Sequence, residues 1–134
     1  MTQSILSVDD SAAMRQIISA SLSEAGYRVS TACDGVAALG LARDERFDLV
    51  LTDQHMPGMD GLALIRALRA LPGYGSAPIL VLTTEVDAAY KEAARAAGAS
   101  GWLLKPVDPA MLIEVVGALL GASAASIQAN NERG

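Results

Sequence analysis

The chain has 134 residues, and about half of them (51%) are hydrophobic, which suits a single domain with one buried core. Its formal net charge of −5 argues against a nucleic-acid-binding surface, and no apolar run approaches the roughly 18 residues of a membrane span. The one cysteine, Cys33, excludes an internal disulfide. Because the first residues show no secretory leader, we expect a cytoplasmic protein. We also expect a monomer that contacts neither nucleic acid nor membrane.

The first half of the chain alternates short apolar strands with amphipathic helices. Residues 4–8 form an apolar strand, and the Asp-Asp-Ser sequence after it is typical of a helix N-cap, with the helix ending near Gly26. Residues 28–32 alternate polar and apolar side chains, as a half-exposed edge strand does. An Asp-Gly pair opens a helix over 35–46, and the apolar strand 47–52 follows.

The second half continues the same alternation. Helical spacing of leucine and isoleucine predicts a helix over 61–70, and the unbroken apolar run 78–83 predicts a strand that is covered on both faces. An alanine-rich helix over 88–97 stops at a glycine and leads to a short strand, 101–104. An Asp-Pro cap then opens an amphipathic helix over 109–120.

Five successive strand–helix units predict an α/β fold. Short links between such units require a parallel sheet with right-handed crossovers and helices on both faces, which is an open three-layer sandwich. The strand 28–32 belongs at an edge, because only one of its faces is apolar. We expect the domain to span 1–121 and the small, polar segment 122–134 to be a frayed tail.

Polar residues fall at the same end of four predicted strands. The carboxyl ends of parallel strands meet at one edge of a sheet, so three carboxylates, one hydroxyl and one ammonium are expected there. Clustered carboxylates repel one another and favour a hard cation, Mg²⁺ or Mn²⁺. Such a site is typical of phosphoryl transfer to an acid. The residues are Asp9, Asp10, Asp53, Thr83 and Lys105.

Four blocks of sequence carry a family resemblance. "SVDDS", "DLVLTDQHMPGMDGL", "ILVLTTE" and "AGASGWLLKP" occur in this order between residues 4 and 120. They resemble the signature blocks of response-regulator receiver domains in two-component systems, and most closely the single-domain chemotaxis regulators of the CheY kind. The resemblance implies a flavodoxin-like sheet with strand order 2-1-3-4-5, which spacing alone does not determine.

The resemblance also implies roles for individual residues. Asp53 matches the aspartate that accepts a phosphoryl group from a histidine kinase, here one of the CheA kind. Asp10, Asp53 and the backbone carbonyl of His55 would bind Mg²⁺, with Asp9 supporting the ion through water. Lys105 and the hydroxyl of Thr83 would contact the phosphoryl oxygens. The family often has a cis peptide bond before the proline that matches Pro106.

Further positions match the family's switch and tuning residues. Trp102 stands where the family usually has Tyr or Phe, a side chain that turns inward when Thr83 moves toward the phosphoryl group. The face made by the fourth helix, fifth strand and fifth helix would then bind an output protein, for example a flagellar motor switch. His55 and Glu85 would tune the hydrolysis of the acyl phosphate. The protein would therefore not be an enzyme beyond its own phosphorylation and dephosphorylation, and no organic cofactor is expected.

The bland interpretation of several polar and aromatic residues is structural. Asp60 precedes a helix and is expected to be its cap, and Cys33 is expected to be a small buried side chain. Trp102 also fits a half-buried strand aromatic, and His55 a solvent-facing loop residue.

Other functions of an α/β fold require motifs that this chain lacks. An aspartate-nucleophile phosphatase would need a second acid two positions after its nucleophile, where this chain has His55. A nucleotide switch would need a phosphate-binding Gly-Lys loop, and a flavin carrier would need a neutral phosphate loop after the first strand; both are absent. Within the regulator class, a phosphate sink or a phosphorelay carrier remains an alternative to a motor-binding regulator.

Overall fold

Five strands alternate with five helices in the computed structural model, which describes residues 2–84 and 87–133, with side chains described up to residue 121. In chain order the elements are β1 (Ser4–Val8), α1 (Ala12–Glu24), β2 (Arg28–Ala32), α2 (Gly35–Asp44), β3 (Leu49–Asp53), α3 (Gly61–Ala70), β4 (Ile79–Thr83), α4 (Ala88–Ala97), β5 (Gly101–Leu104) and α5 (Pro109–Arg133). Within the described residues, no helix is both long enough and apolar enough to cross a bilayer. The predicted order of elements is confirmed.

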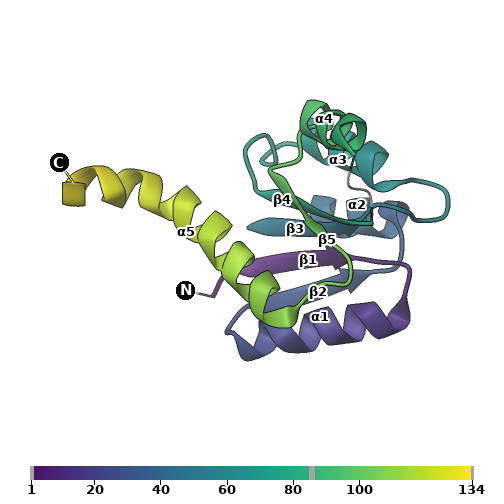
Figure 1. Ribbon diagram of the computed structural model, residues 1–134, viewed down its shortest axis with the longest axis horizontal. Coiled ribbons are helices and arrows are strands. Elements are labelled where there is room, and N and C mark those ends of the chain that lie inside the picture. Colours follow the sequence, from purple (N-terminus) through teal and green to yellow (C-terminus); the bar gives the residue numbers. More distant parts are fainter. Residues whose placement is uncertain (1, 85–86, 134) are drawn as a thin grey trace.

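The strands form one parallel sheet in the order β2-β1-β3-β4-β5, as expected of a flavodoxin-like fold. Strand β2 lies at an edge, in agreement with its alternating sequence. Helices α1 and α5 cover one face of the sheet, and α2, α3 and α4 cover the other (Figure 1). The three-layer sandwich predicted from the sequence is therefore confirmed.

The two central apolar strands supply both halves of the core. Every residue of β3 and β4 is buried. Successive side chains alternate between the layers: Leu80 packs with α1 and α5, whereas Val81 packs with α2, α3 and α4. Because both faces of these strands are covered, their sequences are apolar without alternation.

Side-chain caps fix where the helices begin. Ser11, Asp34, Asp60 and Asp87 each accept a hydrogen bond from the backbone N–H three residues further on, at the start of α1, α2, α3 and α4. The cap predicted at Asp60 is confirmed, with an Oδ1 to Ala63 N distance of 2.9 Å. These caps satisfy backbone N–H groups in the first turns of the four helices that follow the carboxyl ends of β1, β2, β3 and β4.

Three expectations differ from the structure. Cys33 is exposed rather than buried, because it lies in the turn after β2 and outside both layers of the core. Helix α2 ends at Asp44, two residues early. Met111, an apolar residue of the predicted amphipathic helix 109–120, is 54% exposed, whereas Leu112 and Val116 are buried.

The last helix continues past the expected domain boundary. Helix α5 runs to Arg133, beyond residue 121 where the sequence predicts a tail. The side chains of 122–134 lie outside the described residues, so the frayed tail stays a prediction.

Candidate functional site

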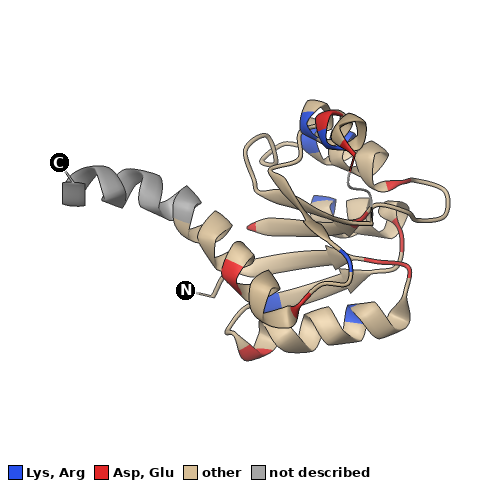
Figure 2. Ribbon diagram, in the orientation of Figure 1, with Lys and Arg blue, Asp and Glu red and all other residues tan. Residues whose placement is uncertain are grey.

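The carboxyl end of the sheet gathers the polar residues singled out in the sequence. Asp53 is the last residue of β3 and Thr83 the last residue of β4. Asp9 and Asp10 follow β1, and Lys105 follows β5. Figure 2 shows acidic segments and a basic segment together at this end of the sheet. The parallel strands therefore bring the five predicted residues to one rim.

Three carboxylates form a compact cluster. Oxygens of Asp9, Asp10 and Asp53 all lie within 4.8 Å of one another. Asp9 and Asp53 are 1% and 6% exposed, whereas Asp10 is exposed. Two acids thus stand at the floor of the cluster and the third stands at its rim.

Lys105 partly neutralises the cluster. Its ammonium nitrogen lies 2.5 Å from Asp53 Oδ1 and 4.0 Å from Asp9 Oδ2. Three carboxylates and one ammonium leave a formal charge of −2 in the cluster. This charge equals in size and opposes in sign that of a divalent metal ion.

The two carboxylate oxygens of Asp9 have different surroundings. Its Oδ1 accepts a hydrogen bond from the backbone N–H of Ser11 at 2.9 Å. Its Oδ2 is buried and accepts no hydrogen bond from the described residues. Burial raises the pKa of the Asp9 carboxyl, and the nearby charges of Asp53 and Asp10 raise it further, against the lowering effects of Ser11 and Lys105.

These observations test whether a hard cation fits the cluster. All the side-chain atoms that could ligate an ion here are carboxylate oxygens. One of them, Asp9 Oδ2, is buried and accepts no hydrogen bond from the described residues. Oxygen-only ligands are those that Mg²⁺ prefers. The described residues therefore fit a divalent cation of this kind.

The loop after β3 holds Asp53 through its backbone. The N–H of Gln54 donates to Asp53 Oδ1 at 2.9 Å, and the N–H of Gly61 donates to the carbonyl of Gln54 at 2.9 Å. A Cβ on Gly61 would lie only 2.5 Å from the backbone oxygen of Asp53. Glycine is required here because α3 begins in direct contact with the end of β3.

Sequence reasoning missed Gln54. Its side chain is 7% exposed, and its amide oxygen accepts a hydrogen bond from the hydroxyl of Thr83. The Thr83 hydroxyl, which is predicted to donate a hydrogen bond to a phosphoryl group, thus already donates one to Gln54. The only sequence signal was a polar residue directly after a buried strand, which by itself is typical of a turn.

Of the predicted switch and tuning residues, Trp102 and His55 lie in the described part of the chain and Glu85 does not. Trp102 is half-buried, packs against the core on the α2–α4 side, and has the ammonium of Lys91 5.7 Å from its ring centroid. His55 is exposed, as its loop interpretation predicts. Glu85 lies outside the described residues. The Lys105–Pro106 peptide bond is cis.

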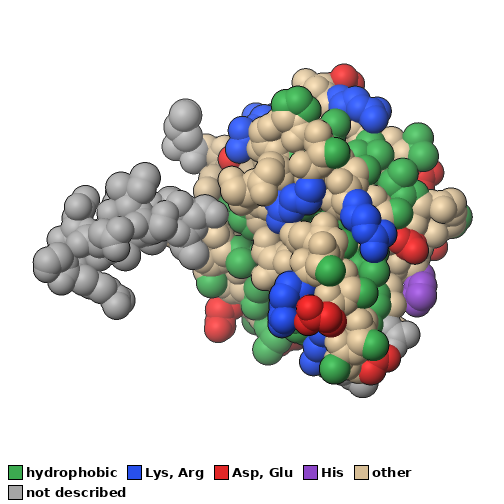
Figure 3. Space-filling model, turned by 90° about the horizontal axis from the view of Figure 1, so that it is seen from above, with side chains coloured by type: hydrophobic (Ala, Val, Ile, Leu, Met, Phe, Trp, Pro, Cys, Tyr) green, Lys and Arg blue, Asp and Glu red, His purple; other side chains and the backbone are tan. Residues whose placement is uncertain are grey.

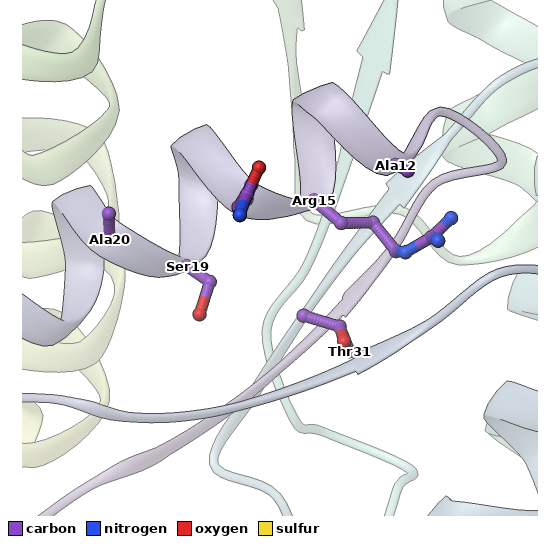
Figure 4. Close-up of a pocket in the computed structure, with 6 residues that line it drawn as sticks. Ala12, Arg15, Ser19, Ala20 and Thr31 are labelled. Atoms are coloured by element: carbon purple, nitrogen blue, oxygen red, sulfur yellow. The ribbon is translucent and has the colours of Figure 1, made fainter.

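A hollow on the surface of α1 lies near the acidic cluster. It has a volume of about 540 Å³, and Figure 4 shows that α1 supplies most of its lining while Thr31 comes from β2. Its lining residues are Ala12, Arg15, Gln16, Ser19, Ala20 and Thr31. The Arg15 guanidinium already donates to the backbone oxygen of Asp9 at 2.8 Å. No acidic residue lines this hollow, so it offers no carboxylate to accept a phosphoryl group or to bind a metal ion.

Comparison with known proteins identifies the class to which this fold and site belong. The model of the response regulator receiver domain matches residues 5–117. The chain therefore belongs to the response regulator receiver family. Receiver domains accept phosphoryl groups from histidine kinases.

Individual relatives narrow this assignment to CheY-like receivers. The chemotaxis protein CheY of Pseudomonas aeruginosa is 37% identical over 113 residues, which cover 84% of this chain and 91% of that protein. The response regulator PleD of Caulobacter vibrioides is 37% identical over 119 residues, 89% of this chain. The chain spans only about a quarter (26%) of PleD's length.

Solved structures give the same result. Chemotaxis protein CheY4 of Vibrio cholerae superposes with a TM-score of 0.87 at 41% identity, covering 89% of this chain and 99% of that one. The receiver domain of sensor histidine kinase PA1611 from P. aeruginosa superposes with a TM-score of 0.82 at 32% identity, covering 90% and 99%. That structure is described with a magnesium ion coordinated in the active site cleft.

Proposed function

We propose that this protein is a CheY-like response regulator that takes a phosphoryl group from a histidine kinase onto Asp53. The observation that carries the proposal is the position of the Asp53 carboxylate, which is nearly buried and lies 2.5 Å from the Lys105 ammonium inside the three-acid cluster. A buried acid at the carboxyl end of a parallel sheet, beside a cation and a metal-binding set of acids, is the arrangement that phosphoryl transfer to an aspartate needs.

The two oxygens of Asp53 have different surroundings. Oδ1 accepts hydrogen bonds from Lys105 and from the backbone of Gln54. Oδ2 is therefore the nucleophile: it forms the P–O bond while the P–N bond of the donor histidine breaks and leaves its electron pair on the imidazole. Lys105 is positioned to bind a phosphoryl oxygen and to offset the charge that the group brings. The protein is the acceptor in this reaction and otherwise catalyses only its own dephosphorylation.

The cluster would hold the divalent ion that this transfer requires. Asp10 and Asp53 would bind Mg²⁺ (or Mn²⁺) directly, Asp9 would support it through water, and the backbone carbonyl of His55 would complete the protein ligands. When bound, the ion neutralises oxygen charge on the transferring group. The magnesium described in the PA1611 receiver supports this choice of ion.

Phosphorylation would then change the output face. New charge-assisted hydrogen bonds from Thr83 and Lys105 contribute about 1.5–3 kcal/mol each. Together they approach the roughly 5.5 kcal/mol that moves a two-state equilibrium from 1:99 to 99:1. Trp102 lies on β5, the strand next to β4, which ends at Thr83, and it would turn inward as Thr83 moves toward the phosphoryl group.

The output protein would bind to α4, β5 and α5. Lys91 and Arg95 lie on α4, and the ammonium of Lys91 lies 5.7 Å from the ring centroid of Trp102 on β5. Figure 3, seen from above, shows Lys and Arg side chains among apolar ones on this face of the molecule. The likeness to CheY proteins supports a chemotaxis output such as a flagellar motor switch.

Trp102 fluorescence tests the phosphorylation step. Trp102 is the one tryptophan of the chain, so its signal has a single origin. Mg²⁺ with a small acyl-phosphate donor should change the fluorescence of the wild type, and the change should vanish in Asp53→Asn. Asp60→Asn removes a carboxylate outside the cluster and keeps an N-cap oxygen, so it should respond like the wild type. An unaltered response in Asp53→Asn would show that another residue accepts the phosphoryl group.

A capture experiment separates the possible outputs. With beryllofluoride as phosphoryl mimic, a motor-binding regulator should capture a purified motor-switch protein only in the modified state. A phosphate sink should bind the kinase and no output protein, and a relay carrier should pass its phosphoryl group to a second histidine-containing protein.

A further inference from the structure

Gln54 connects the acceptor aspartate to the switch hydroxyl. It follows Asp53 directly, and its backbone N–H donates to Asp53 Oδ1 at 2.9 Å. On the neighbouring strand Asp53 pairs with Leu82, so the next residues along, Gln54 and Thr83, lie side by side. The Gln54 amide oxygen accepts the hydrogen bond of the Thr83 hydroxyl, and both side chains are buried, 7% and 1% exposed.

We propose that Gln54 is a positioning residue that holds the Thr83 hydroxyl in the unphosphorylated protein. A phosphoryl oxygen on Asp53 must then displace the Gln54 amide before Thr83 can donate to it. Gln54 would thereby set how strongly the pocket binds a phosphoryl group and how readily Thr83 and Trp102 change conformation. This inference rests on the proposed function.

The displaced amide has a place to go. Gln54 lines a cavity of about 80 Å³ together with His55, Asp60, Leu62 and Tyr90. A water molecule occupies about 30 Å³ in the liquid, so the cavity has room for water that would bond the released amide. The lining residue Tyr90 belongs to α4, so the cavity joins the acceptor loop to the helix that carries the output face.

The exchange has a measurable size. A buried neutral hydrogen bond contributes about 0.5–1.5 kcal/mol net, which corresponds to about a twofold to tenfold change in an equilibrium constant. Gln54→Met keeps the length of the side chain and removes its acceptor. Beryllofluoride with Mg²⁺, titrated by Trp102 fluorescence, should therefore bind Gln54→Met about twofold to tenfold more tightly than the wild type.

Two further variants make the test specific. Leu62→Met alters the same cavity without touching the contact with Thr83, so its beryllofluoride affinity should stay at the wild-type value. Thr83→Val removes the hydroxyl, and in this background Gln54→Met should change the affinity no further. A merely structural role of Gln54 would produce the same change in both backgrounds.

A second readout does not depend on phosphorylation. The same two substitutions, singly and together, form a double-mutant cycle in the free energy of unfolding without Mg²⁺ or beryllofluoride. A favourable coupling between Gln54 and Thr83 is expected, and its absence would overturn the inference. Failure of the wild type to bind beryllofluoride would instead count against the proposed function. Equal or weaker binding by Gln54→Met, in a wild type that binds, would overturn the inference alone.

Discussion

Replacing Asp9 by Asn should make the metal-free protein more stable and abolish much of its stabilisation by Mg²⁺. The Asn side chain keeps an oxygen that accepts the hydrogen bond of Ser11 N–H, which lies 2.9 Å from Asp9 Oδ1. What the substitution removes is the negative charge of a side chain that is only 1% exposed. The experiment therefore isolates the electrostatic cost of the acid cluster.

The magnitude follows from the distances in the cluster. Lys105 Nζ, 4.0 Å from Asp9 Oδ2, attracts it by about 4 kcal/mol at an effective dielectric of 20. Asp53, with an oxygen within 4.8 Å, repels it by about 3.5 kcal/mol on the same scale, so these two contributions nearly cancel. Asp10 is exposed, and solvent reduces its repulsion to about 1 kcal/mol or less. With the cost of burying the carboxylate, we expect Asp9→Asn to gain about 1–3 kcal/mol.

The pH dependence has a definite sign. Burial, followed by the neighbouring acids, raises the pKa of Asp9 above its ordinary value of 3.8 in the folded state. A raised carboxyl pKa means that the folded state binds the proton more tightly than the unfolded state does. The stability that the bound proton contributes is fully present below pH 3.8 and is lost as the pH rises through the folded-state pKa of Asp9. The advantage of Asp9→Asn should therefore be largest at neutral pH and shrink toward acid pH.

Urea denaturation at several pH values, with and without Mg²⁺, measures both effects. Asp44→Asn removes an equal charge from an exposed position at the end of α2 and should change the free energy of unfolding by less than about 0.5 kcal/mol. Mg²⁺ should stabilise the wild type more than Asp9→Asn, because the ion relieves a repulsion that the variant lacks. The electrostatic account is refuted if Asp9→Asn is the less stable protein at neutral pH without a divalent ion.

Three further substitutions test the packing and charge of the site. Gly61→Ala should lose about 1–3 kcal/mol in urea denaturation, because the new Cβ would lie 2.5 Å from the Asp53 backbone oxygen; an unchanged midpoint would contradict this contact. Tyr74→Phe should cost about 1–3 kcal/mol in the same assay, since the buried hydroxyl accepts the N–H of Phe47 at 3.1 Å; a neutral result would mean that this N–H finds another acceptor. Lys105→Met should weaken beryllofluoride binding, measured by Trp102 fluorescence, by about tenfold or more, because one charge-assisted hydrogen bond is lost; wild-type affinity would exclude Lys105 from the phosphoryl site.

Much of the site could be predicted because it depends on chain direction rather than on packing. Strand–helix alternation requires parallel strands, and parallel strands place their carboxyl ends together. Asp53 and Lys105 could therefore be brought to one rim without knowing any side-chain conformation. The N-cap at Asp60 was equally local, because its acceptor and donor lie three residues apart on the chain.

Other features depended on contacts between segments that are distant in sequence. Gln54 meets Thr83 only because the register of β3 and β4 pairs Asp53 with Leu82. The Arg69 side chain gives a second example, since its guanidinium donates to the carbonyl of Gly98 at 2.6 Å and links the end of α3 to the end of α4. No periodicity in the sequence encodes either contact.

The sequence by itself determined the order of the elements, the edge position of β2 and the composition of the acidic rim. Hydrophobic periodicity and cap residues act over a few neighbouring positions, so they can be read along the chain. Only the tertiary structure decided that Cys33 is exposed and that the Gln54 amide oxygen accepts the hydrogen bond of the Thr83 hydroxyl. Burial and hydrogen-bond partners depend on which layers close over a residue, and that is a property of the whole packed molecule.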